Sequence, residues 1–401
     1  MACADKGKVM DKKKERVLIV HNYYQIPGGE DTVVANDKRL LEDHGHIVAL
    51  YTRNNSELKG KGIIRRLFSL FASFFSVKTY RDVRRIIKEQ RIDIVHVHNT
   101  LCLISPSVYY AALSMNTPVV QTIHNFRLLC PGGAFYRDGH ICEDCVADGL
   151  GCAVRHRCYR SSRLQTIACV ICTRLHRAAG IYGKINYICL TEFNKEKLLN
   201  LKQIQEKNVF VKANFTKTIN EIIPYDKRQK QYIFAGRLDK LKGIDILLRA
   251  WKLLAGEGPK LIICGTGPME SWCKEFIEEN KINAEMRGLV TNTEVRKLIG
   301  ESKALILPTQ WYEGFPMVIV EAYSAGTPVI CSDMGNAGSV VIEGETGWKY
   351  PYDSPEALSS LIKEERSIEI QSIIKHYENN YTENSSYLKT KNIYECITAN
   401  G

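Results

Sequence analysis

Short apolar, β-rich runs alternate with helix-length amphipathic segments along most of this chain of 401 residues. Segments such as Thr32–His44 and Ser105–Met115 predict helices between the early runs. Because strand–helix alternation is typical of parallel sheets covered by helices on both faces, we expect an α/β fold. The predicted strands of the first half are 16–20, 46–52, 93–99, 118–124, 185–190 and 208–214.

The alternation stops at the charged stretch PYDKRQKQ (224–231), the candidate hinge, and then starts again. The second series has predicted strands at 232–236, 260–265, 304–308 and 328–333, and predicted helices at Ile244–Leu254, Glu270–Asn280 and Thr293–Ile299. We expect an N-terminal domain over 1–225, a second domain over 226–375, and a helix over 376–401 that returns to the first domain. Ligands of such sheets bind at the carboxyl ends of the strands, here across a cleft.

The charge balance favours an anionic partner. There are 55 Lys and Arg against 44 Asp and Glu, a formal net charge of +11, which suits a nucleotide, a phospholipid surface or a nucleic acid. The run Val17–Val20 is too short for a signal peptide, and no stretch reaches the ~20 apolar residues that span a bilayer. We expect a cytoplasmic protein, with the inner face of the cell membrane as one location, whose 14 cysteines are thiols or metal ligands.

Residues 311–330, WYEGFPMVIVEAYSAGTPVI, keep two acids in an otherwise apolar stretch. Pro316 suits the first position of a helix over Met317–Ala325. That helix places Glu313 just before its start and Glu321 one turn in, where both carboxylates could accept hydrogen bonds from sugar hydroxyls. Free N–H groups of Gly314, Phe315 and Met317 could hold phosphate. The alternative is two ordinary solvent-facing acids.

Three further loops follow predicted strands. Gly28 and Gly29 precede a helix; Arg237 and Lys242 flank a helix entrance; Gly265 and Gly267 lie in GTGP. Glycines let a backbone approach a ligand, and two cations of different reach suit a diphosphate. Taken singly, each is also explained as a plain turn or as solvated cations. Together the four loops suit the pieces of one nucleotide sugar.

The motifs R-L-x-x-x-K-G (237–243), G-x-G-P (265–268) and E-G-F-P-x4-E (313–321) resemble the retaining glycosyltransferases of family 4, in the same order and spacing. The resemblance covers most of the chain. It implies the GT-B fold, in which two Rossmann-like, doubly wound parallel-sheet domains face each other across a cleft.

The resemblance also implies a role for each matching residue. Arg237 and Lys242 would hold the donor diphosphate, Glu321 the ribose and Glu313 the transferred hexose, while His124 would contact the donor sugar. Further donor contacts would be Gly28, Gly29, Gly265, Gly267, Leu289, Val290, Gly314, Phe315, Pro316, Met317 and Val318. Two positions depart from the commonest family pattern, Pro316 and Asn125.

The implied reaction moves a sugar, commonly from a UDP-sugar, to a hydroxyl of a saccharide or lipid-linked saccharide with retention of configuration, in cell-surface polysaccharide synthesis. No Asp-x-Asp occurs in the chain, so fixed cations rather than a bridging metal would neutralise the diphosphate, and no cofactor is expected for catalysis. The alternatives are a GT-B sugar-nucleotide epimerase or phosphorylase, and a zinc-dependent nucleic-acid-binding protein. We expect no nucleic-acid partner, because no recognised module is present.

Two segments fall outside these motifs. The insertion 130–158 holds five cysteines, and Cys130, Cys142, Cys145 and Cys158 could bind a structural zinc ion; ordinary thiols are the alternative. A similar loop occurs in a subset of the same transferases, on the acceptor side. The basic amphipathic segment 59–88 suits either an anionic membrane interface or helices packed on the first sheet.

Overall fold

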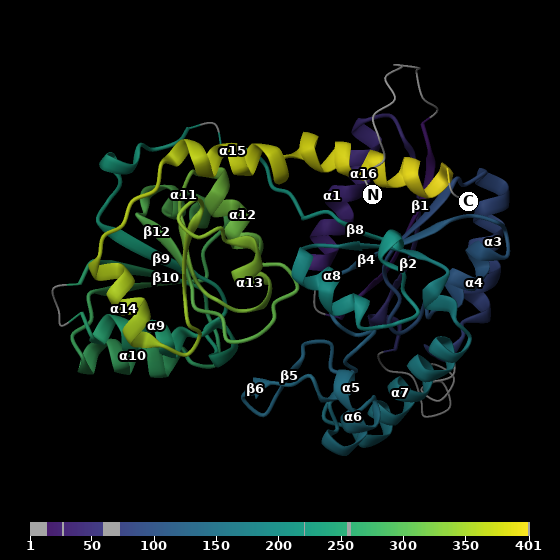
Figure 1. The fold of residues 1–401 in the computed structure, drawn as a ribbon, viewed down its shortest axis with the longest axis horizontal. Coiled ribbons are helices and arrows are strands. Elements are labelled where there is room, and N and C mark those ends of the chain that lie inside the picture. Colours follow the sequence, from purple (N-terminus) through teal and green to yellow (C-terminus); the bar gives the residue numbers. More distant parts are fainter. Residues whose placement is uncertain (1–13, 26–27, 59–72, 220, 255–257, 400–401) are drawn as a thin grey trace.

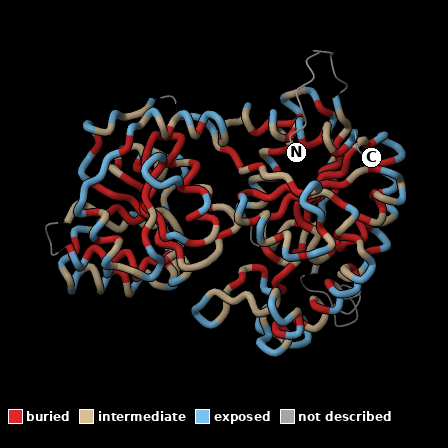
Figure 2. Tube along the Cα trace, in the orientation of Figure 1, coloured by how far each residue is buried: buried red, intermediate tan, exposed pale blue. Residues whose placement is uncertain are grey.

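The computed structural model describes residues 14–25, 28–58, 73–219, 221–254 and 258–399. It contains two six-stranded parallel sheets in separate lobes, which the C-terminal helices bridge (Figure 1). Figure 2 shows the buried residues concentrated in and around the two sheets. The predicted GT-B architecture, with two α/β domains, is confirmed.

The N-terminal sheet has the strand order β2-β1-β3-β4-β7-β8. Its strands are β1 (Arg16–Tyr23), β2 (Ile47–Asn54), β3 (Ile94–Asn99), β4 (Val119–Ile123), β7 (Asn186–Cys189) and β8 (Val209–Val211). All six were predicted, with ends shifted by up to three residues. The helices around it are α1 (Gly29–Asp43), α3 (Val77–Gln90), α4 (Ser107–Leu113) and α8 (Glu192–Leu199).

Both faces of this sheet are buried, as strand alternation requires. Leu18 and Val20 of β1 pack in the cluster that contains Val83 of α3. Val17 and Ile19 point to the other face, into the cluster that contains Val34 of α1. Because both faces are covered, the functional groups of this sheet can reach a ligand only at the ends of its strands.

The C-terminal sheet has the order β11-β10-β9-β12-β13-β14. Its strands are β9 (Gln231–Ala235), β10 (Lys260–Cys264), β11 (Ala284–Gly288), β12 (Ala304–Leu307), β13 (Val329–Ser332) and β14 (Gly347–Tyr350). Neither edge strand, β11 nor β14, is among the four predicted strands of this half. The helices are α9 (Ile244–Lys252), α10 (Glu270–Glu279), α11 (Asn292–Glu301), α12 (Met317–Ser324), α13 (Gly335–Val340), α14 (Pro355–Lys363) and α15 (Ile370–Asn380).

The predicted hinge 224–231 is largely part of the C-terminal domain. The Arg228 side chain is buried and donates hydrogen bonds to the carbonyl oxygens of Ser302, Ala325 and Gly326. Gln231 already belongs to β9. The segment that can flex therefore ends before Arg228.

The last helix, α16 (Glu383–Ala399), lies on the N-terminal sheet (Figure 1). Its residues Ile393, Tyr394 and Ile397 are buried in the same cluster as Val17 and Ile19 of β1. The chain thus crosses between the two lobes twice, once before β9 and once between α15 and α16.

The cysteine-rich insertion 130–158, together with the residues that follow it up to Ala178, forms a small lobe beside the N-terminal sheet, which we call the cysteine-rich lobe (Figure 1). It holds the hairpin β5 (Tyr136–Arg137) and β6 (His140–Ile141), then α5 (Asp144–Ala147), α6 (Gly151–His156) and α7 (Arg163–Ala178). Single 3₁₀ turns elsewhere span Asn55–Leu58, Ile181–Gly183, Glu206–Asn208, Tyr225–Lys227 and Lys240–Lys242.

Most of the apolar part of the basic segment 59–88 lies outside the described residues, and its end forms the start of α3. Within the part of the chain that the structure describes, no helix combines the length and the apolar character needed to cross a bilayer.

Candidate functional site

Three of the predicted loops, and the loop of the predicted donor contact Leu289, lie at one edge of the C-terminal sheet. Leu289 follows β11, Gly265 follows β10, Arg237 lies two residues after β9, and Glu313 is in the loop after β12. These four strands are neighbours in the sheet and run parallel. Parallel strands end at the same edge, so the four loops form one continuous rim, which we call the C-terminal rim.

The centre of this rim is an ion pair. Lys242 Nζ lies 2.7 Å from Glu313 Oε2, and the two side chains are 25% and 7% exposed. Asp239 caps the turn that carries the lysine by accepting a hydrogen bond from the Lys242 N–H, 3.0 Å away. Glu313 Oε1 is buried and has no hydrogen-bond partner among the described residues. Glu313 is therefore not a solvent-facing acid, and one of its oxygens is free to accept from a ligand.

Arg237 and Leu289 are the exposed members of the rim. The Arg237 side chain is 67% exposed and its Nε lies 3.1 Å from Asp239 Oδ2. Leu289 is 84% exposed. An exposed ion pair is weak, so the Arg237 guanidinium can exchange Asp239 for an incoming anion at little loss.

Glu321 is held on α12 by its own partner. Pro316 occupies the N-cap, not the first helical position as predicted, so the helix begins at Met317. Asn292 Nδ2 donates to Glu321 Oε1 at 2.7 Å. Burial is the main effect on this carboxyl and raises its pKa. Val318 and Phe315, two of the predicted donor contacts, are partly buried against the core.

Packing alone accounts for the glycines of GTGP. A Cβ at Gly265, whose φ is +133°, would lie 1.9 Å from the Gly236 carbonyl oxygen. A Cβ at Gly267 would lie 2.4 Å from the carbonyl oxygen of Leu238. Both glycines let this loop touch the Arg237 loop, so their donor contacts stay predictions.

Gly28 and Gly29 have open space in front of them, because an added Cβ at either would meet nothing within 4 Å among the described atoms. Helix α1 begins at Gly29, three residues earlier than predicted. Asp31 closes the first turn by accepting from the Gly28 N–H at 3.0 Å. The backbone there is accessible to a ligand.

The two domains meet at Gly314. A Cβ there would lie 2.5 Å from the carbonyl oxygen of His124, which directly follows β4. Asn194 Nδ2 of α8 and Asn336 Nδ2 of α13 donate to the Gly314 carbonyl oxygen at 3.1 and 2.9 Å. Thr191 donates a hydrogen bond to Asn336 Oδ1 from the opposite domain. This contact sets the N-terminal edge against the C-terminal rim.

Sequence reasoning missed Thr191, Asn194 and Asn336. The available signal was their position, because each lies just after a strand and around the start of a helix. Polar residues at such positions commonly cap the helix, and Thr191 does accept from the Asn194 N–H. Their second function, between domains, depends on tertiary structure.

Three histidines form a column behind the N-terminal edge, of which His96 and His98 are buried and His124 is partly buried. The rings of His96 and His98 stack with centroids 4.4 Å apart, and His98 Nδ1 lies 3.0 Å from His124 Nε2. Burial lowers the pKa of His96 to about 4 and that of His124 to about 3. His124 is therefore a neutral imidazole, oriented by His98. His96 and His98 received no predicted role, although their spacing of two in a strand places them on one face.

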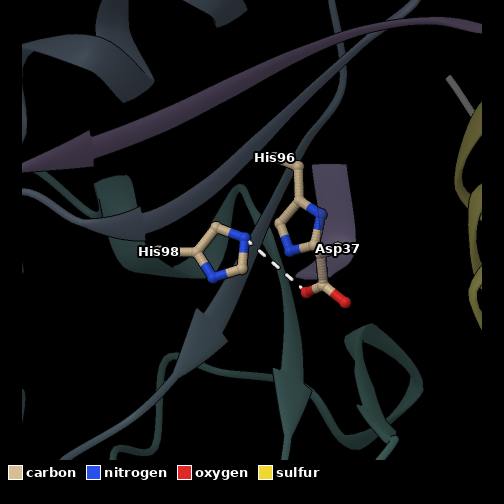
Figure 3. Close-up of side chains that lie close together, drawn as sticks. All are labelled: Asp37, His96 and His98. Carbon is tan, nitrogen blue, oxygen red and sulfur yellow. Dashed lines mark ion pairs between the residues drawn. The ribbon is translucent and has the colours of Figure 1, made fainter. Parts of the chain in front are cut away.

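Figure 3 shows the polar group at the inner end of this column, Asp37 with His96 and His98. His98 Nε2 lies 3.8 Å from Asp37 Oδ2, and Lys212 Nζ lies 3.1 Å from Asp37 Oδ1. Both ring nitrogens of His96 are already bonded, to Tyr394 and Thr122. The lysine cation supplies the counter-charge of the carboxylate, so we assign no metal here.

Among the described residues, Asp37, His96 and His98 are the one group of three or more whose ligand atoms lie within 4.8 Å of one another. The sulfur atoms of Cys130, Cys142, Cys145 and Cys158 do not form such a group. Burial raises the pKa of Cys145 to about 12, which favours the neutral thiol. This arrangement gives the zinc prediction no support.

Two family models match the chain. Residues 27–141 match "Glycosyltransferase Family 4", and residues 215–382 match "Glycosyl transferases group 1". The two matched stretches contain the Gly28 loop with His124 and the whole C-terminal rim, respectively.

Curated relatives carry related descriptions. The amylovoran biosynthesis glycosyltransferase AmsD of Erwinia amylovora is 24% identical over 87% of this chain and 89% of its own. An uncharacterised glycosyltransferase of Methanocaldococcus jannaschii is 24% identical over 54% of this chain, and the chain covers under two thirds of that relative, 63%.

Solved structures share the fold. A glycosyltransferase from Rickettsia africae superposes with a TM-score of 0.67 at 17% identity, over 97% of this chain and 100% of the other. HepE of Anabaena in complex with UDP gives 0.63 at 15% identity, over 95% and 100%.

Proposed function

We propose that this chain, a glycosyltransferase with the GT-B fold, transfers a sugar from a nucleoside diphosphate to a hydroxyl of a saccharide or lipid-linked saccharide, with retention of anomeric configuration, in cell-surface polysaccharide synthesis. The observation that carries the proposal is the C-terminal rim. The loop after β9 holds Arg237 and Lys242, and the loop and helix after β12 hold Glu313 and Glu321, with His124 of the other domain next to Gly314.

Each part of the rim suits one part of the donor. Leu289 and Val290 provide an apolar surface for the base, and the Glu321 carboxylate accepts from the ribose hydroxyls. Arg237 and Lys242 bind the diphosphate, while Glu313 accepts from the sugar. The nucleotide bound by HepE, UDP, supports a UDP-sugar as the donor.

The chemical step exchanges one carbon–oxygen bond for another and moves one proton. The acceptor oxygen bonds to the anomeric carbon, the bond from that carbon to the diphosphate oxygen breaks, and the hydroxyl proton passes to the leaving diphosphate on the same face. Negative charge grows on the diphosphate in the transition state. Lys242 and Arg237 stabilise it there, and removing one such contact costs about 2.7–4 kcal/mol.

Lys242 and Glu313 together make this site responsive to the donor. In the structure the ammonium neutralises the carboxylate at 2.7 Å. When a diphosphate binds, the flexible Lys242 side chain can contact the phosphate and the Glu313 carboxylate at the same time. The sugar attached to that phosphate then lies close enough for its hydroxyls to donate hydrogen bonds to Glu313. Neutral His124 then faces the sugar as a hydrogen-bonding group and not as a general base, because its pKa of about 3 leaves it too weakly basic at neutral pH.

The test is a thermal-shift screen of nucleotides and nucleotide sugars. A ligand at 100 times its Kd stabilises the protein by about 2.7 kcal/mol. We expect Glu321→Ala and Arg237→Ala to abolish that shift while the ligand-free melting temperature stays near that of the parent. A parent-like response in both variants would contradict the assignment of the rim.

Product analysis then separates the proposal from the epimerase alternative. A transferase releases the nucleoside diphosphate and forms a glycoside whose anomeric proton keeps the configuration of the donor. An epimerase would consume nucleotide sugar without any acceptor. An inverted product would leave transfer standing and reject retention.

Two predictions made from the sequence have no support among the structural observations above. A zinc ion in the cysteine-rich lobe and attachment to the inner face of the membrane each need their own measurement. Metal analysis of the purified chain tests the first, and flotation with anionic vesicles tests the second.

A further inference from the structure

A cavity lies at the carboxyl edge of the N-terminal sheet. Its volume is about 220 Å³, and the loops after β1, β2, β3 and β4 form most of its wall. These four strands are neighbours in the order β2-β1-β3-β4. The lining residues that matter here are Tyr24, Asn55, Cys102, Arg127, Tyr159 and Arg160. Arg127 lies three residues after His124, so the cavity adjoins the site of transfer.

The cysteine-rich lobe supplies the remaining wall through Cys158, Tyr159 and Arg160. Gly132 makes that closure tight, since a Cβ there would lie 3.4 Å from the Cys158 carbonyl oxygen. Arg160 belongs to this lobe and lines the cavity. The nucleotide site gives the lobe no function, whereas the cavity does.

Two guanidinium groups converge in the cavity. Arg127 lies 5.6 Å and Arg160 5.5 Å from the centroid of the Tyr159 ring. Arg127 Nε is buried and has no hydrogen-bond partner among the described residues. Stacked guanidinium groups are preoriented and keep their edge N–H groups available to a ligand.

The other titratable groups do not cancel this charge. Burial raises the pKa of the Cys102 thiol, which keeps it neutral, and raises the pKa of Tyr24 to about 12. Glu30 is a carboxyl that interacts electrostatically with Arg127, and burial raises its pKa as well. Its Oε1 accepts from Asn125 Nδ2 at 3.2 Å. The cavity therefore carries two fixed cations against one carboxyl that burial disfavours in its charged form.

We propose that this cavity binds an anionic group of the acceptor, a phosphate or a carboxylate, and so selects acidic or phosphate-linked saccharides over neutral ones. This inference rests on the proposed transfer function and names its acceptor class. The planar guanidinium fork matches both anions, and the acceptor hydroxyl that reacts would lie toward His124. Tyr159 offers a ring face for the sugar next to the anion.

The experiment titrates the full-length chain with inorganic phosphate, glucuronate and glucose, and follows binding by calorimetry. Saturating UDP is present throughout, because phosphate alone also suits Arg237 and Lys242. We expect phosphate or glucuronate to bind and glucose not to bind. Phosphate alone would point to a phosphate-linked acceptor and glucuronate alone to an acidic sugar. No binding of either anion, or equal binding of glucose, would overturn the proposal.

Three variants identify the residues. Arg127→Gln and Arg160→Gln should each weaken anion binding about 10- to 100-fold, the range expected for a lost charge-assisted hydrogen bond. Arg163→Gln, on an exposed residue of the same lobe, makes the same change in net charge and should bind as the parent does. Unchanged anion binding in both cavity variants would reject the cavity as the site.

The UDP response reports separately on the proposed function. If Arg127→Gln and Arg160→Gln lose anion binding but keep the UDP thermal shift, both proposals stand. If the parent shows no UDP response, the titration is repeated in Arg237→Ala without nucleotide, and anion binding that still depends on Arg127 keeps the cavity assignment while the donor site fails.

Discussion

The two edges that face each other in this protein solve different problems. The C-terminal rim presents charge to solvent, with Arg237 67% exposed and the Lys242–Glu313 pair in reach of a ligand. At the N-terminal edge the histidine column is hidden, since His96 and His98 are buried and neutral behind His124. The rim is built to exchange partners, and the column is built to hold one ring in place, next to the cavity proposed to bind the acceptor. This division predicts that substitutions in the two edges fail in different assays.

The largest expected effect comes from Lys242→Ala. It removes the cation that faces the diphosphate and leaves Glu313 without its partner, so we expect the rate of transfer to fall about 10²- to 10³-fold, or about 2.7–4 kcal/mol. Steady-state kinetics with a nucleotide sugar measure it. Lys240→Ala, on an exposed residue of the same turn, is the matched control and should keep the parent rate. Equal rates for the two variants would remove Lys242 from the mechanism.

Gly314→Ala separates the edges directly. The new Cβ would lie 2.5 Å from the His124 carbonyl oxygen, so the two domains must move apart. We expect kcat to fall about 100-fold, the effect of a displacement of about 1 Å, while UDP still binds because the C-terminal rim is intact. Gly300→Ala on α11 would meet Ala325 at an ordinary 3.8 Å and serves as the control. Loss of UDP binding in Gly314→Ala would show that the edges are not separable.

The buried column makes the N-terminal edge acid-sensitive. The pKa of His96 falls to about 4 in the folded chain, below its ordinary 6.5, so the unfolded chain takes up protons first as the pH falls. The stability that it contributes is complete above pH 6.5 and declines toward pH 4, by about 1.4 kcal/mol per pH unit.

His96→Gln should flatten the decline of the melting temperature between pH 6.5 and 4, whatever its effect at pH 7. His140→Gln, on an exposed histidine of the small lobe, should leave the slope unchanged. If the two variants show the same slope, His96 does not account for the acid sensitivity.

The smallest expected effect is on the stability of the C-terminal rim and comes from Glu321→Gln. Burial raises the pKa of Glu321, so its charged form is disfavoured in the folded protein, and its contribution is lost as the pH rises through that raised pKa. Glu321→Gln can keep the bond from Asn292 and should raise the ligand-free stability at pH 7 by less than about 1 kcal/mol, while it weakens UDP binding. Denaturant titration measures the first effect and calorimetry the second. Glu275→Gln, on an exposed residue of α10, is the control. If Glu321→Gln lowered the stability and left UDP binding unchanged, it would contradict this role of Glu321.

The sequence predicted the elements better than the contacts between them. Strand alternation placed every strand of the N-terminal sheet, because buried parallel strands are runs of apolar residues that need no partner to be recognised. Strands β11 (AEMRG) and β14 (GWKY) escaped because both contain charged residues, so neither is an apolar run. Arg228 looked like part of a charged linker, and only the structure shows that its guanidinium satisfies buried carbonyl oxygens of the C-terminal domain, to which it belongs.

The candidate site divides in the same way. Motif spacing located the C-terminal rim, since its residues lie close along the chain to the strand ends that position them. The glycines of GTGP were assigned to the ligand, although Gly265 and Gly267 are already required by the neighbouring loop. Asn336 and Asn194, which join the domains, come from helices 142 positions apart in sequence, and no local pattern can report such a pair. The same limit hid the bond from His98 to His124.

Helix α16 supplies Ile393, Tyr394 and Ile397 to the core that contains the first strand of the chain. During synthesis on a ribosome, one face of the N-terminal sheet therefore stays unsealed until the entire second lobe has been translated. Until then the nascent chain exposes an apolar sheet face, which favours aggregation and binding by chaperones. A truncated gene product that stops after α15 would keep both halves of the reaction centre and still be prone to precipitate.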